Sequence, residues 1–264
     1  MRLFYRLLDR FFIKQPRLRR AVTRLIYGSC DAPVVLAGAN MLVNRALENG
    51  HARAAALCES SSLLRDEIPV LVSMANLIGP CQTFVDVGAN VGLYSVVFSR
   101  FRSLHPDLQI VAFEVDPRTF ERLSVNAADH GFRAVRCALG AEHGMQKFVR
   151  GAVSNVTTTE EHASSYNVMT DSFDAEIQTL DDFEWSGSLL LKIDVEGQEM
   201  QVLAGARSLF EQGRITAVYL DGYSDHHCYD FLESRGFELF DGRTLMPATR
   251  QTFSLLAVRR PAPG

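Results

Sequence analysis

The segment Leu189–Glu199, LLLKIDVEGQE, places three charged side chains where a buried strand is expected to end. Alternation puts Lys192, Asp194 and Glu196 on one side of the chain for as long as the strand lasts. Open α/β sheets bind ligands and do their chemistry at the carboxyl ends of their strands. Asp194 or Glu196 could therefore act as a general base, with Lys192 holding the site or stabilising an alkoxide. The alternative is structural: Asp194 caps the next helix and Lys192 neutralises it.

A second polar set is expected at the same edge, where the strand 215–221 ends in Asp221. His226 and His227 follow, and each is either a base or an ordinary exposed loop histidine. Carboxylate oxygens are also the ligands that a hard cation such as Mg²⁺ prefers, and a bound cation could orient and acidify a sugar diol. A metal site is thus an alternative to a metal-free base, and its ligands would be Asp194, Glu196 and Asp221.

The stretch TFVDVGANVGLYS, from Thr83, runs from a strand pattern through two glycines into a helical pattern. At Gly88 and Gly92 the missing Cβ allows close approach of a ligand and a positive φ. The first N–H groups of the following helix favour a negative group. The pattern also fits a plain tight turn. It is not the three-glycine dinucleotide fingerprint, because Asn90 stands where the middle glycine would be.

Glu114 lies 22 residues beyond Gly92, at the end of the next predicted strand. A carboxylate at that position hydrogen-bonds both hydroxyls of a ribose. Asp86 heads the glycine turn and Asp116 follows Glu114, which gives the pattern D-x-G-x-N-x-G and E-x-D-P. This pattern indicates an S-adenosylmethionine site rather than a nicotinamide site. Asp86 could pair with the ammonium group of that cofactor.

The elements that must position these residues alternate after Gly79-Pro80. The predicted strands cover 82–87, 109–114, 133–138, 188–194 and 215–221, and the predicted helices cover 92–104, 117–130, 198–211 and 224–235. Such alternation predicts a parallel sheet covered on both faces. The runs FELFD and TFSLLAV predict a closing antiparallel hairpin. The polar segment 154–174 is predicted to be a long loop, either a lid or a mobile insertion.

Four stretches together, FVDVGANVGLYS, IVAFEVDPRTFERLSVN, QTLDDF and LLLKIDVEGQEMQVLAGA, resemble the FkbM family of S-adenosylmethionine-dependent methyltransferases. The resemblance covers about Thr83 to Tyr223. It implies a class I methyltransferase fold: an α/β, Rossmann-like, seven-stranded and mostly parallel sheet with a final antiparallel strand. It also implies O-methylation of sugars, polysaccharides or polyketide-type metabolites.

The same resemblance implies roles for individual residues. The methionine half of the cofactor would be lined by Asp86, Gly88, Asn90 and Gly92, and its ribose and adenine side by Glu114 and Asp116. The segment 192–197 would face the methyl acceptor. One departure is that the family often has Glu where this chain has Asp221, which shortens any contact by a methylene group.

These observations predict an O-methyltransferase that uses S-adenosyl-L-methionine and acts on a hydroxyl of a sugar, a glycolipid or a glycosylated metabolite. Two other classes stay open: a nicotinamide-dependent oxidoreductase on a similar sheet, and a non-catalytic nucleotide-binding module. The formal net charge of −4 over 264 residues argues against general nucleic-acid binding.

The predicted domain division is a helical N-terminal region, 1–80, and a methyltransferase domain, 81–264. Within 1–27 there are eight basic residues and one acidic residue, and the apolar residues recur at helical spacing. This segment is predicted to be a basic amphipathic helix that packs on the domain or on a second subunit, or lies on an anionic membrane. Helices are also predicted from Ala32 to about Pro80.

Composition indicates a cytoplasmic protein, with peripheral contact at the inner face of a membrane as the alternative for 1–27. The N-terminus lacks the pattern of a signal peptide. The five cysteines are scattered and suit a reducing compartment, where we expect them to fill the core. The uncharged run 68–85 indicates a helix, a turn and a strand rather than a membrane span.

Overall fold

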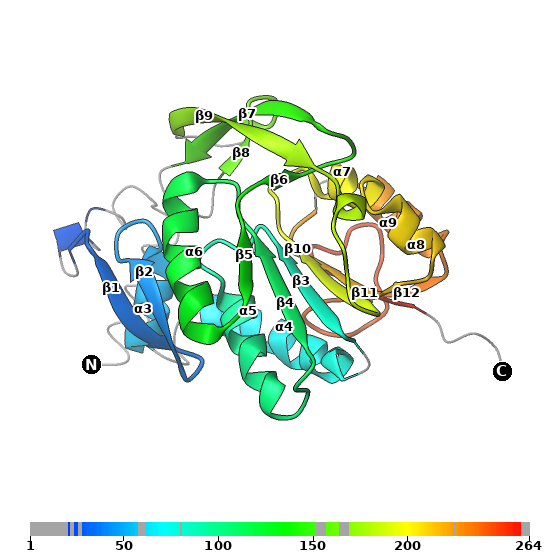
Figure 1. The fold of residues 1–264 in the computed structure, drawn as a ribbon, viewed down its shortest axis with the longest axis horizontal. Helices are drawn as coiled ribbons and strands as arrows, with labels where there is room; N and C mark the ends of the chain where they lie inside the picture. The colour runs from blue at the N-terminus through cyan, green and yellow to red at the C-terminus, as the bar shows by residue number, and fades with distance from the viewer. Residues whose placement is uncertain are drawn as a thin grey trace.

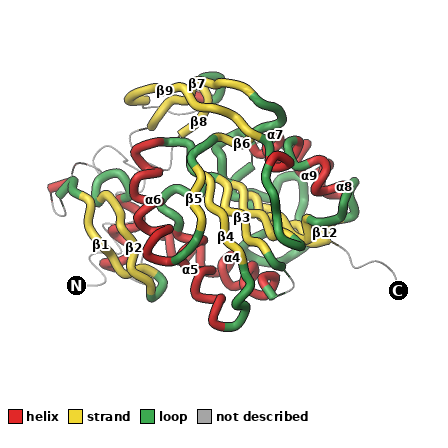
Figure 2. The backbone as a smooth tube through the Cα atoms, viewed as in Figure 1, coloured by secondary structure: helices red, strands yellow, loops and turns green. Residues whose placement is uncertain are grey.

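The computed structural model describes residues 21, 24–25, 28–57, 62–79, 81–151, 157–163, 169–223 and 225–259. Its centre is a seven-stranded sheet in the order β12-β13-β11-β10-β3-β4-β5 (Figures 1 and 2). The strands are β3 (Thr83–Val87), β4 (Gln109–Phe113), β5 (Arg133–Val135), β10 (Leu189–Ile193), β11 (Ile215–Leu220), β12 (Phe237–Asp241) and β13 (Leu255–Arg259). Only β13 runs antiparallel to its neighbours. The predicted seven-stranded sheet with a final antiparallel strand is therefore confirmed.

Helices cover both faces of this sheet. One core contains residues of α4 (Ser62–Ile78), α5 (Leu93–Ser99) and α6 (Pro117–His130). The other contains residues of α7 (Glu199–Ala204), α8 (Arg207–Glu211) and α9 (His227–Glu233). Along β10 the side chains alternate between them: Leu190 belongs to the first core, and Leu189, Leu191 and Ile193 belong to the second. By this alternation Lys192 lies on the face covered by α4 and α5.

Most predicted elements are found within a few residues of their expected bounds, and α6 has the bounds that were predicted. The helix predicted over 92–104 continues after α5 as the 3₁₀ turn η2 (Arg100–Ser103). The helix predicted over 198–211 is divided into α7 and α8 at Gly205. A Cβ at Gly205 would lie 2.0 Å from the carbonyl oxygen of Gly140. Glycine thus allows close packing against the chain after β6 (Ala138–Leu139).

The prediction of helix from Ala32 is wrong for the first part of that segment. It forms a hairpin of β1 (Asp31–Leu36) and β2 (Ala39–Asn44), followed by α3 (Asn49–Leu57) and α4. The turn residues Ala37 and Gly38 both have positive φ, of 49° and 75°. Positive φ at both central residues is what the favoured type I′ turn of a two-residue hairpin requires. Alternate side chains of β2 are buried, a period-2 pattern that its Ala- and Leu-containing sequence conceals.

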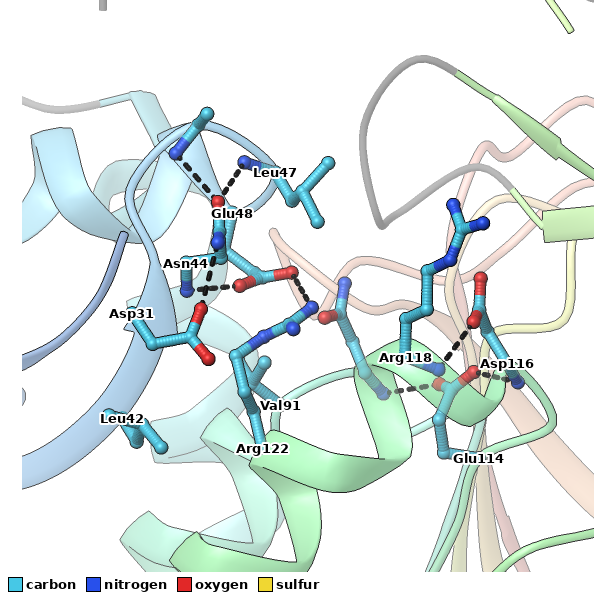
Figure 3. Close-up of polar contacts among 12 residues, drawn as sticks. Asp31, Leu42, Asn44, Leu47, Glu48, Val91, Glu114, Asp116, Arg118 and Arg122 are labelled. Atoms are coloured by element: carbon cyan, nitrogen blue, oxygen red, sulfur yellow. Dashed lines mark hydrogen bonds and ion pairs between the residues drawn. The ribbon is translucent and has the colours of Figure 1, made fainter. Parts of the chain in front are cut away.

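The hairpin is attached to α6. The Asn126 side chain accepts a hydrogen bond from the Leu42 N–H (2.6 Å) and donates to the Leu42 carbonyl (3.1 Å). Arg122 and Glu48 form a buried ion pair of 2.7 Å (Figure 3). The region before β3 is therefore bonded to the main domain, and its division from that domain at residue 80 stays a prediction.

The expected long loop at 154–174 is corrected for 157–159 and 169–174, whereas 154–156 and 164–168 lie outside the described residues. The chain forms a second sheet in the order β6-β9-β7-β8, with β7 (Gly144–Gly151), β8 (Thr157–Thr159) and β9 (Met169–Gln178). Figure 1 shows β7 and β9 above the main sheet. Hydrogen bonding to β7 overrides the polar composition of this segment, since a strand needs backbone partners more than apolar side chains.

Several predictions concern residues outside this description. The basic segment 1–27 falls almost wholly among them, as does Cys58. Cys81, Cys137 and Cys228 are buried as expected, whereas Cys30 is exposed, which corrects the expectation for it. None of the helices in the described ranges combines the length and hydropathy that a bilayer span requires.

Candidate functional site

A cavity of about 750 Å³ lies at the carboxyl ends of β3, β4, β10 and β11. Residues of the second sheet, such as Phe148 and Ile177, and of the N-terminal helices, such as His51 and Glu67, complete its lining. Such volumes, roughly 300–1,000 Å³, are typical of small-molecule and cofactor sites. Five of the polar residues predicted near the strand ends are thus brought to one cavity: Glu114, Lys192, Asp194, Glu196 and Asp221.

The two glycines of the turn after β3 have different roles. Gly88 lines the cavity with φ of +71°, and a Cβ there would lie 1.9 Å from the carbonyl oxygen of Asp194. Gly92 has φ of +87° but is not among the lining residues, and a Cβ on it would meet Leu123 at 2.8 Å. Gly88 therefore lets β3 and β10 end side by side, whereas Gly92 lets α5 begin close to α6. The structure places Gly88 at the cavity and Gly92 outside its lining, and the contact of either glycine with a ligand stays a prediction.

Glu114 follows β4 and is 7% exposed. Its Oε2 accepts the N–H of Asn90 (2.9 Å) and its Oε1 accepts the N–H of Asp116 (2.8 Å). Burial raises the pKa of Glu114 to about 7, although these two bonds act against the shift. Glu114 and Asn90 both line the cavity, so this carboxyl is held at the cavity wall, and its contact with a ribose stays a prediction.

Asp116 lies outside the cavity lining, and its contact with the cofactor stays a prediction. Its Oδ1 accepts the N–H of Arg118 at the start of α6 (Figure 3). Its Oδ2 accepts a hydrogen bond from Arg150 Nε at 2.6 Å. Asp116 is thus an N-cap that also ties α6 to the second sheet.

Asp86 and Lys192 form a buried pair between β3 and β10. The Lys192 Nζ lies 3.3 Å from Asp86 Oδ1 and donates to the Gly88 carbonyl at 3.1 Å. Burial alone would lower the pKa of Lys192, but the surrounding carboxylates, Asp86 first, raise it. Lys192 is therefore an ammonium ion at the cavity wall. Asp86 is not among the lining residues, and its contact with the cofactor stays a prediction.

Asp194, Glu196 and Asp221 all line the cavity, as expected from their strand positions. Asp194 Oδ2 lies 3.5 Å from Lys192 Nζ. Burial raises the pKa of Asp194 well above its usual range, although Lys192 acts against the shift. Glu196 has φ of 46°, and its carbonyl accepts a hydrogen bond from Thr158 of β8 at 2.8 Å. The second sheet therefore fastens the turn that follows β10.

The metal alternative finds no support in this arrangement. Within the described ranges, no group of three His, Cys, Asp or Glu residues is placed so that it could hold a metal ion. His226 and His227 lie outside the lining of the cavity. The His227 side chain is 83% exposed and pairs with Asp225, so it behaves as an ordinary surface histidine.

Sequence reasoning missed the lining residues that come from outside the strand ends, chiefly Glu67 and Arg243. Glu67 lies on α4, and its carboxylate accepts a hydrogen bond from the Tyr94 hydroxyl. Burial and the charge of Asp221 raise the pKa of Glu67 to about 7. A single Glu on an amphipathic helix resembles a surface residue in sequence, and only the docking of α4 reveals its position.

The comparisons with known proteins identify the family of this chain. The model of the family described as Methyltransferase FkbM domain matches residues 86–239. Methyltransferase 1 of Beauveria bassiana (strain ARSEF 2860) is 25% identical over 144 residues, which cover 46% of this chain and 57% of that protein. The chain thus spans little more than half the length of this curated relative.

Solved structures with similar chains include an FkbM methyltransferase from Methylobacillus flagellatus KT. It is 14% identical, with a TM-score of 0.43 over 67% of this chain and 44% of that chain. A TehB-like SAM-dependent methyltransferase from Corynebacterium glutamicum is 12% identical, with a TM-score of 0.40 over 72% of this chain and 85% of that chain. The fold assignment rests on the family match and on the strand order itself.

Proposed function

Because this chain belongs to the FkbM methyltransferase domain family, we propose that it is an S-adenosylmethionine-dependent O-methyltransferase. The observation that carries the proposal is the cavity at the strand ends, where Glu114 faces the hollow from β4 and Lys192 and Asp194 face it from β10. The carboxyl group proposed to bind the ribose, Glu114, and the proposed reaction centre, Lys192 and Asp194, thus border the same cavity.

The residues present fit this cofactor. Gly88 leaves the room at the tip of β3 that a Cβ would fill. The Glu114 carboxyl still has lone pairs for ribose hydroxyls after accepting two backbone N–H groups. Thr157 Oγ1 lines the cavity and is buried with no hydrogen-bond partner among the described residues, so a ligand could satisfy it. When bound, S-adenosylmethionine supplies a methyl group on a positively charged sulfur.

The chain must then align an acceptor hydroxyl and remove its proton. Alignment in a closed site contributes much of the acceleration of such a displacement. Asp194 is our candidate for the proton acceptor, because it lines the cavity and burial raises its pKa. Lys192, held by Asp86 and the Gly88 carbonyl, stands 3.5 Å from Asp194 and stabilises negative charge there.

The proposed acceptor is a hydroxyl of a sugar, a glycolipid or a glycosylated metabolite. Support comes from the mixture of groups at the cavity, where Asp221, Glu196 and Arg243 offer hydrogen-bonding atoms suited to a polyol. Phe253 lines the same space, is 63% exposed and carries Arg243 above its ring at 5.1 Å. An exposed ring beside charged groups is suited to the apolar face of a sugar.

The test is transfer of a tritiated methyl group from S-adenosylmethionine to a panel of monosaccharides, oligosaccharides and glycolipids. We expect label in an alkali-stable ether, and a loss of about 100-fold or more in kcat for Asp194→Asn. Glu121→Gln, at an exposed position of α6 outside the lining, is the matched control and should keep its rate. Label in an amine product, or full activity of Asp194→Asn, would contradict the proposal.

A further inference from the structure

Carboxyl groups outnumber cationic side chains in the lining of the cavity. Two cationic side chains, Lys192 and Arg243, face seven carboxyl groups: Glu67, Glu114, Glu142, Glu161, Asp194, Glu196 and Asp221. Burial lowers the pKa of His51, also in the lining, to about 4, so this histidine adds no charge at neutral pH. The part of the cavity that the structure describes is therefore suited to a cation.

Among these carboxyl groups, Glu67 is the one that lies on α4, and two stacked tyrosines connect it to the end of β11. Its carboxylate accepts the hydroxyl of Tyr94. The Tyr94 ring stacks on Tyr219 with 6.4 Å between centroids, and the Tyr219 hydroxyl donates to Asp221 at 3.1 Å. The Lys192 Nζ lies 5.3 Å from the centre of the Tyr94 ring. Glu67 is thus fixed beside the charged ends of β10 and β11.

The groups that face Glu67 explain its titration. After burial, the charge of Asp221 raises its pKa, whereas the Tyr94 bond and the charges of Lys192 and Arg243 lower it, which leaves it at about 7. In the empty cavity this carboxyl therefore holds a proton in much of the population at neutral pH. A cation that enters favours the ionised form, so its binding releases protons.

We propose that Glu67 is the charge partner through which α4 makes the cavity prefer a cationic ligand over its neutral counterpart. The cation is the sulfonium of S-adenosylmethionine, and the counterpart is the thioether of S-adenosylhomocysteine, so the inference rests on the proposed function. α4 lies outside the residues matched by the family model. Because methyl transfer removes the positive charge, this preference also favours replacement of product by fresh cofactor.

The test is calorimetric titration of the full chain with each of the two ligands. We expect the wild type to bind S-adenosylmethionine more tightly than S-adenosylhomocysteine, and Glu67→Gln to reduce that preference about three- to tenfold, as for loss of one charge within a partly buried site. The ratio of affinities cancels groups that meet the shared adenosine, such as Glu114. Glutamine still accepts the Tyr94 hydroxyl, so the cavity keeps its shape.

Two further variants separate charge from packing. Glu121→Gln removes an exposed carboxylate of α6 that lies outside this lining and should leave the ratio unchanged. Glu67→Asp keeps the charge and should restore most of the preference. An equal ratio in the wild type and in a folded Glu67→Gln would overturn this inference while leaving the proposed function intact. Failure of the wild type to bind either ligand would overturn both.

A measurement on the wild type alone covers the case in which Glu67→Gln does not fold. The preference for S-adenosylmethionine should rise between about pH 6 and about pH 8, because Glu67 ionises over this range. Titrations in two buffers of different ionisation enthalpy should show more protons released with the cation than with the thioether. A ratio that is constant over this range would overturn the inference.

Discussion

Lys192 and Asp86 are direct partners in the register of β10 and β3, and their charged atoms lie 3.3 Å apart inside the sheet. Their side chains are 4% and 1% exposed. In this position Lys192 Nζ donates a hydrogen bond to the Gly88 carbonyl and lies 3.5 Å from Asp194 Oδ2. One buried ion pair therefore fixes the group that borders the proposed reaction centre.

Breaking this pair should destabilise the protein strongly. Lys192→Met leaves Asp86 buried without its cation, which should cost about 3–5 kcal/mol in the free energy of unfolding, measured by urea denaturation. Lys147→Met, at an exposed position of β7, should change it by less than about 0.5 kcal/mol. The double variant Lys192→Met/Asp86→Asn should recover part of the loss. A double variant less stable than Lys192→Met would contradict the pairing.

Gly88 should tolerate no side chain. Gly88→Ala places a Cβ 1.9 Å from the Asp194 carbonyl oxygen at a positive φ, so the tips of β3 and β10 must move apart. The positive φ alone costs about 1–2 kcal/mol. We expect lower stability together with loss of S-adenosylmethionine binding. Gly144→Ala, where nothing lies within 4 Å of the added atom, should retain both. Normal binding by Gly88→Ala would show that the turn can relax.

The second sheet should depend on Arg150 far more than on Arg118, although both pair with Asp171. Arg150 also pairs with Asp116, and its side chain is 10% exposed, against 59% for Arg118. Arg150→Met should cost about 3 kcal/mol, because Asp116 loses a buried partner. Arg118→Met should cost about 0–1 kcal/mol. Equal losses of stability in the two variants, measured by thermal or chemical denaturation, would argue against a stabilising role of the buried Arg150–Asp116 pair.

Stability should fall as pH rises in the ligand-free protein, in part through Glu114. Its pKa is raised from 4.5 to about 7 in the folded state, so the folded chain holds a proton that the unfolded chain has released. This contribution is complete below about pH 4.5 and is lost as pH rises through about 7. Glu114→Gln should remove up to about 3 kcal/mol of that decline. The check is denaturation of both proteins across this range, and parallel pH profiles would contradict the assignment.

The main sheet could be predicted because its strands are short apolar runs between clear turn residues. The run LLLKI is buried along its whole length. Because the end of this run could be recognised, Lys192 and Asp194 could be placed at the carboxyl end of the strand. Helix α6 has an Asp N-cap, a Pro at its start and a Gly after its end, so its bounds could be read directly.

The misplaced elements lack such signals. The hairpin β1–β2 packs on one face only, and its Ala- and Leu-containing strands resemble helix in composition. The strands β8 and β9 are polar and are defined by their pairing with β7. Glu67 could not be identified because its role depends on where α4 docks. The family pattern placed Asp116 in the site, whereas its role as the N-cap of α6 is what the structure shows.

The central claim is that the strand-end cavity holds S-adenosylmethionine, and calorimetric titration tests it most directly. The account predicts saturable binding of S-adenosylmethionine and S-adenosylhomocysteine to the wild type and none of NAD. Binding should weaken by about 100-fold in Glu114→Ala, which loses hydrogen bonds to a charged group. Binding of NAD without S-adenosylmethionine, or unchanged affinity in Glu114→Ala, would contradict it.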